Sequence, residues 1–189
     1  MSVLVVLFLT AVLALFSGVY NQGKFARYIG ILGLLVALCV SFSPELAFFN
    51  QYKSMFDFNE NAALFTKISL VVTLLIFFLG GFAFNNHRSH QSELYSLMLF
   101  SLIGAVILFS FTNLVTLFLG IEILSIPLYV MAGSNKTDLR SNEASIKYFL
   151  MGSFATGILL FGMTLVYGAT RTFYISNMAN VIASSAPES

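Results

Sequence analysis

Glu122 is the residue whose type and position best fit chemistry in this sequence. It is the only charged residue between Glu93 and Lys136, in an otherwise apolar stretch. As a single helix that stretch would be about 63 Å long, twice the roughly 30 Å of hydrocarbon in a bilayer, so it predicts two membrane-spanning helices separated at the polar run 110–113. Glu122 then lies roughly 13 Å into the second helix. A carboxylate at that depth costs about 2.5–3.5 kcal/mol and typically serves an ion or proton path.

A polar track accompanies Glu122 along the same helix. Ser125 and Tyr129 follow it at i+3 and i+7, so their hydroxyl groups continue along one helical face. Pro127 has no N–H and therefore leaves the carbonyl of Ile123 without its helical partner. Such a track can hold water beside a buried acid. The alternative is a structural acid that hydrogen-bonds to a neighbouring helix.

Two lysines are candidate partners of this carboxylate. Lys147, near the start of the sixth predicted helix, lies an axial distance of roughly 8 Å from Glu122, which a lysine side chain or one water can span. Glu143 precedes Lys147 in the favourable i,i+4 order, and a lysine near a helix end can also snorkel to the interface, so its partner stays open. Lys67, about six residues into the third helix, is more typical of an interface lysine.

The composition predicts an all-α, polytopic membrane protein. The chain has 189 residues, of which 58% are hydrophobic and 9% charged, against about 25% charged in soluble domains. The apolar runs predict one membrane domain over 1–189 with six transmembrane helices, an extracytoplasmic segment at 45–61 and a polar tail at 171–189. The predicted helices cover 2–20, 26–43, 62–84, 94–111, 113–132 and 143–168.

The positive charges of the loops predict that both termini are extracytoplasmic. Loops that carry more Lys and Arg stay in the cytoplasm. Lys53 and Arg171 lie on the predicted outer side. The predicted inner loops carry five such residues: Lys24, Arg27, Arg88, Lys136 and Arg140.

Several classes of function are excluded by what the sequence does not contain. The net charge of +1 and the lack of a basic cluster with interleaved aromatic residues exclude a nucleic-acid partner. Cys39 is the only cysteine, and His87 and His90 in a polar loop make a weak metal site. No motif for a nucleotide, haem or iron–sulfur cluster is present, so any redox chemistry is expected in a partner protein.

The sixth predicted helix carries small residues at helical spacing. Gly152 is followed by Ala155 and Thr156, and Ser153 by Gly157. Small residues at i, i+3 and i+4 let helix backbones approach closely in a membrane, which favours a tight bundle.

Four segments closely resemble subunit N of the bacterial proton-pumping NADH–quinone oxidoreductase, respiratory complex I. They are residues 93–95, 117–129, 143–149 and 160–167. The resemblance is strong over 93–170 and is limited to hydropathy and helix order before residue 93. The antiporter-like subunits L and M share the glutamate of the fifth helix, whereas the E-A-S-I-K-Y start of the sixth helix points to subunit N.

This resemblance implies roles for two residues. The position of Glu122 is regarded in that family as part of the proton path, and the position of Lys147 as functionally important. Family members have about fourteen helices, and their central lysines in helices 7 and 8 would lie beyond Ser189. The sequence therefore looks like the N-terminal part of such a subunit.

The resulting hypothesis is a proton-translocating subunit in the membrane arm of a complex I-like enzyme of the bacterial inner membrane. Its partners would be the other membrane-arm subunits and the lipid bilayer. NADH, FMN, iron–sulfur clusters and quinone are expected in partner subunits, with no cofactor in this chain. Two alternatives remain: a cation/proton antiporter component without redox partners, and a structural or assembly protein without transport.

Overall fold

The computed structural model describes residues 2–18, 23–42, 55–83 and 91–185. These residues form helices joined by short connecting segments, and residues of these segments form two isolated β-bridges. The helices in chain order are α1 (Ser2–Ser17), α2 (Gly23–Ser41), α3 (Glu60–Ala83), α4 (Gln91–Phe109), α5 (Leu114–Ala132), α6 (Leu139–Thr170) and α7 (Ile175–Ser185).

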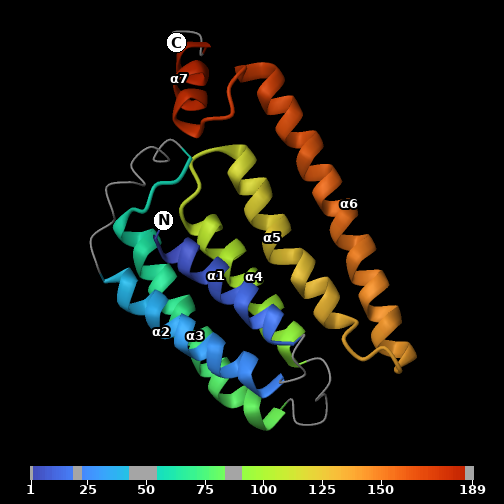
Figure 1. The fold of residues 1–189 in the computed structure, drawn as a ribbon. Coiled ribbons are helices and arrows are strands. Elements are labelled where there is room, and N and C mark those ends of the chain that lie inside the picture. The colour runs from blue at the N-terminus through green and yellow to red at the C-terminus, as the bar shows by residue number, and fades with distance from the viewer. Residues whose placement is uncertain (1, 19–22, 43–54, 84–90, 186–189) are drawn as a thin grey trace.

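Helix α4 is the centre of the bundle. It packs against α1, α2, α3 and α5, and its Leu99 and Val106 are fully buried in one apolar core with Leu7 of α1, Leu34 of α2 and Phe77 of α3. Figure 1 shows that helices α1 to α6 alternate in direction, with α5 beside α4 and α6 along the outer flank of α5. The N-terminus of α1 and helix α7 therefore lie toward the same end of the bundle, which we call the α7 end.

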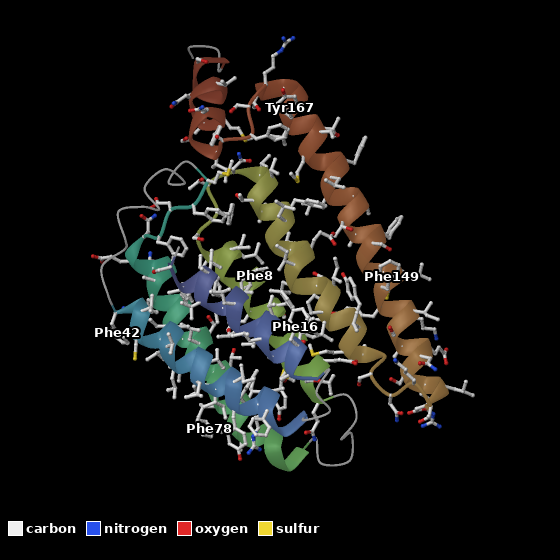
Figure 2. All side chains as sticks on the ribbon, viewed as in Figure 1. Phe8, Phe16, Phe42, Phe78, Phe149 and Tyr167 are labelled. Carbon is white, nitrogen blue, oxygen red and sulfur yellow. The ribbon has the colours of Figure 1, made fainter. Side chains whose placement is uncertain are left out.

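The surface of the bundle is apolar on many sides, as expected for contact with lipid. Figure 2 labels several aromatic side chains, and five of them are more than half exposed: Phe8, Phe16, Phe42, Phe78 and Phe149. Helices α3, α4, α5 and α6 are long and apolar enough to cross a membrane, and α1 and α2 are shorter apolar helices. The protein is thus an all-helical membrane protein with four candidate spans among its described residues.

The predicted break at 110–113 separates α4 from α5. Ser110 donates from its hydroxyl to the carbonyl of Val106 at 3.1 Å, and Asn113 caps α5 by accepting the Val115 N–H at 2.8 Å. A side chain that satisfies a free N–H of the first turn is a typical helix N-cap. The backbone between these two residues is extended, and Phe111 forms a β-bridge with Phe56.

Two boundaries at the C-terminal side differ from the prediction. Helix α6 begins at Leu139 rather than 143, because Asp138 accepts the N–H of Arg140 at 3.0 Å and caps an additional turn. It ends at Thr170 and is followed by the C-cap residue Arg171, whose φ of 54° is left-handed. The segment predicted as a polar tail at 171–189 contains helix α7, because its apolar residues, including Met178, recur at helical spacing.

Some predicted features lie outside the described residues. They are the loop with His87, Arg88 and His90, and residues 45–54 of the predicted extracytoplasmic segment. The side chain of Lys24 is also outside the described part.

Candidate proton-path site

A close approach of two backbones fixes the helix that carries Glu122. A Cβ atom placed on Gly104 of α4 would lie 2.4 Å from the backbone nitrogen of Leu124 and 2.7 Å from its Cα. Only glycine allows this approach, since real Cβ atoms do not come that near to a neighbouring backbone. The contact lies two residues from Glu122, so α4 determines the position of that part of α5.

Glu122 is the ninth residue of the 19-residue helix α5, so it lies near the middle of an apolar span. Its side chain is half-buried. Within the described residues it makes no hydrogen bond and no ion pair. Among the residues that the structure describes, this carboxyl group therefore lacks the partner that a structural acid would have.

The three residues predicted to accompany Glu122 on α5 make different contacts. Ser125 donates its hydroxyl to the carbonyl of Ile121 at 2.6 Å, so its proton is engaged within α5. Pro127 is buried, and it leaves the Ile123 carbonyl without a helical donor. Tyr129, two turns from Glu122 on the same stripe, is 8% exposed. Tyr129 is therefore the companion that reaches the next helix.

Tyr129 joins α5 to the first half of α6 through both its ring and its backbone. Its ring lies edge-on to Tyr148, with centroids 4.8 Å apart, and to Phe149 at 6.0 Å. Its backbone carbonyl accepts the hydroxyl of Ser145 at 3.0 Å. The phenol end lies over Gly152, where a Cβ would be 2.0 Å from the tyrosine oxygen. The face of α6 with Ser145, Tyr148, Phe149 and Gly152 is thus turned toward α5.

Lys147 lies on another face of α6. It follows Ser145 by two residues, about 200° around the helix, so it points away from α5. Its Nζ pairs with the Glu143 carboxylate at 2.5 Å, and the two side chains are 69% and 62% exposed. Of the two partners left open by the sequence, the structure pairs Lys147 with Glu143. Along the helix axis, Glu122 lies about 10 Å from the level of Tyr129 and Lys147, which is close to the predicted axial spacing. The orientation of Lys147 differs from the prediction, because its side chain does not face Glu122.

Lys67 lies away from this site. Its Nζ sits 4.6 Å from the centroid of the Phe42 ring, beyond the last turn of α2. A lysine two turns into a helix, with its ammonium over an aromatic ring, is typical of the membrane interface. The structure does not bring Lys67 to Glu122, and α5 packs against α4 and α6.

Two serines that were not predicted as site residues join α5 to α6. Ser141 donates its hydroxyl to the carbonyl of Ala132 at 2.8 Å, and Ser145 does so to Tyr129. Their i,i+4 spacing on one face was the available signal. Among the described residues, no group of three His, Cys, Asp or Glu side chains could hold a metal ion.

Comparison with known proteins first shows a family to which part of the chain is similar. Residues 110–188 match the family model described as "NADH:quinone oxidoreductase/Mrp antiporter, TM". That range contains Glu122, Lys147 and the α5–α6 contact, so the candidate site lies within the part that matches a transmembrane antiporter-type domain.

Curated relatives and solved structures are more specific. The chain is 43% identical over 148 residues to NADH-quinone oxidoreductase subunit N of Flavobacterium johnsoniae, covering 78% of this chain and 32% of the relative. It is 36% identical over 186 residues to subunit N of Flavobacterium psychrophilum, covering 98% of this chain and 41% of the relative. The chain therefore spans about a third to two-fifths of the length of these relatives.

A chain of respiratory complex I from Thermus thermophilus has a similar structure, with a TM-score of 0.70 and 26% identity over 99% of this chain and 39% of that one. The membrane-bound sulfane sulfur reductase, an archaeal respiratory membrane complex, shares the fold with a TM-score of 0.75 and 22% identity over 99% of this chain and 41% of that one. These findings confirm the resemblance to the N-terminal part of NADH–quinone oxidoreductase subunit N.

Proposed function

We propose that this chain is part of the proton-translocating membrane arm of an NADH–quinone oxidoreductase. The observation that carries the proposal is the half-buried Glu122, placed mid-span in an apolar helix with no ion pair among the described residues. The similarity to subunit N supports the same conclusion.

The chemistry of the site is a change of protonation. We assign to the Glu122 carboxyl group the binding and release of a proton, in step with water or a positive charge that is brought near it or removed. Separating opposite charges by several Å at an effective dielectric constant of about 20 changes their energy by a few kcal/mol, which is enough to switch the proton. Tyr129 lies on the same face of α5 as Glu122 and contacts α6, so a displacement of α6 would change the surroundings of the carboxyl group.

Quinone reduction would take place in partner subunits, which would hold NADH, FMN, iron–sulfur clusters and quinone. The further membrane-arm subunits are the proposed neighbours of this chain in the bacterial inner membrane. The energy released by electron transfer would reach Glu122 through helix displacement, since no cofactor is proposed in this chain.

Affinity purification tests the proposed partnership. A tagged form of the chain, solubilised from its native membranes in mild detergent, should co-purify with NADH–quinone reductase activity. The control is the same tag on an unrelated membrane protein. Recovery of the tagged chain in good yield without any NADH-oxidising subunit would contradict the proposal.

The second candidate is a cation/proton antiporter component, because the matching family model includes Mrp antiporters. Such a protein would use the same carboxyl group but would not need a redox partner. Cation-driven proton exchange in vesicles that lack NADH–quinone reductase would favour this candidate.

We further propose that all six helices α1 to α6 span the membrane with both termini extracytoplasmic. The 16 residues of α1 are about 24 Å long, which a locally thinned bilayer can accommodate. The α5–α6 loop carries Lys136 and Arg140, which favours the cytoplasmic side.

Cysteine labelling tests this topology. With the natural cysteine removed by Cys39→Ser, a membrane-impermeant maleimide should label Ser176→Cys in intact cells and should label Lys136→Cys only after the inner membrane is opened. Both positions are exposed, and Figure 1 places α7 and the α5–α6 loop at opposite ends of the bundle. Labelling of position 136 in intact cells would reverse the assignment.

A further inference from the structure

Helix α6 is held at both ends and open between them. At the α7 end, the Leu114 N–H donates to the carbonyl of Phe173 at 3.0 Å and the Ile175 N–H donates to the carbonyl of Thr112 at 3.2 Å. At the other end, Ser141 and Tyr129 make the contacts described above. Contacts at both ends thus connect α6 to α5 and to the residues just before α5.

The small residues of α6 are not equivalent. A Cβ on Gly152 would lie 2.0 Å from the Tyr129 hydroxyl oxygen, 2.4 Å from Cζ and 3.0 Å from Cε1. Among the residues that the structure describes, a Cβ on Gly157 or Gly162 would meet nothing within 4 Å. Gly152 is therefore the glycine of α6 that determines how closely this helix approaches the Tyr129 side chain.

The Tyr129 side chain has little room to move away. It is 8% exposed and is flanked by the rings of Tyr148 and Phe149. Its backbone is held by the Ser145 hydroxyl. A methyl group at position 152 would thus displace either the tyrosine from the Glu122 stripe or α6 from α5.

We propose that Gly152 is a positioning residue for Glu122, because it sets the distance between α6 and the Glu122–Tyr129 stripe. The inference rests on the proposed function and adds a residue to it. Gly152 contacts Tyr129 rather than Glu122, and it acts through that tyrosine. Lys147, five residues earlier on α6, moves with the same helix, so the spacing at Gly152 also sets where that charge lies relative to the carboxyl group.

The test compares Gly152→Ala with Gly157→Ala and Gly162→Ala in membranes that contain the assembled enzyme. All three replace glycine by alanine in the same helix, so they share the change in helix propensity and differ in the contact. Gly152→Ala should lower the number of protons pumped per electron by at least about two-fold, since overpacking displaces neighbouring groups. The two control variants should keep the ratio of the unmodified enzyme.

Quinone reduction and subunit content are measured in the same membranes, because a merely structural defect would lower them together with pumping. A Gly152→Ala enzyme with an unchanged proton-to-electron ratio would overturn the proposal. If Gly152→Ala prevents assembly, the double variant with Tyr129→Leu supplies the missing space. That variant should assemble and pump better than Gly152→Ala, and an assembled double variant without any recovery of pumping would also overturn the proposal.

The two proposals fail separately. If Glu122→Gln leaves pumping intact, the proposed proton path is wrong. If Glu122→Gln abolishes pumping while Gly152→Ala behaves like Gly157→Ala, only the positioning role of Gly152 is wrong.

Discussion

Glu122→Gln should abolish most proton pumping while the enzyme still assembles. The amide keeps the size of the side chain but cannot carry the proton. Because Glu122 makes no ion pair or hydrogen bond within the described residues, its replacement removes no visible contact. The loss should be on the order of ten-fold or more, as expected for removal of a proton-transfer group. Pumping is measured by quenching of a pH-sensitive dye in membrane vesicles, and assembly by subunit content.

Glu60→Gln is the matched control. Glu60 is an exposed carboxylate at the first turn of α3, so the same chemical change there should leave pumping unchanged. Full pumping by the Glu122→Gln enzyme would instead support a structural role for this acid.

Lys147→Ala should lose most activity, whereas Lys147→Arg should retain much of it, because the prediction assigns the role to the positive charge. Loss of the exposed i,i+4 ion pair with Glu143 would not explain so large a loss of activity, since such pairs contribute only about 0.3–0.5 kcal/mol to stability. Glu143→Gln should therefore be milder than Lys147→Ala. Proton pumping per electron in vesicles is the measurement.

A double-mutant cycle decides whether Lys147 acts on Glu122. The structure places the two on different faces at about 10 Å axial separation, so any coupling must act through displacement of α6 or through space rather than through a direct bond. If the losses from Lys147→Ala and Glu122→Gln are smaller together than their sum, the two residues belong to one network. Simple addition, with Glu143→Gln equal to Lys147→Ala, would make Lys147 a partner of Glu143 alone.

Much of the α4–α5 region was predictable because its signals are local. The lone carboxylate at 122, the length of the apolar stretch and the polar run at 110–113 required two spans and a buried acid. The helix cap at Asn113 follows from a side chain and a backbone two residues apart. The extra turn of α6 and helix α7 were missed, since a cap at Asp138 and a short amphipathic helix are weak signals beside long apolar runs.

The sequence by itself determined that the chain crosses a membrane, where its charged groups lie along the helices, and which carboxyl group is exceptional. These properties depend on apolar length and on helical rise, which act within a single segment. Only the tertiary structure decided that Lys147 faces away from α5, that Gly104 brings α4 against Leu124, and that Gly152, unlike Gly157, meets a tyrosine. The rotation of one helix relative to another depends on side chains from both helices. The sequence of a single helix does not show which residues of its neighbour it will contact.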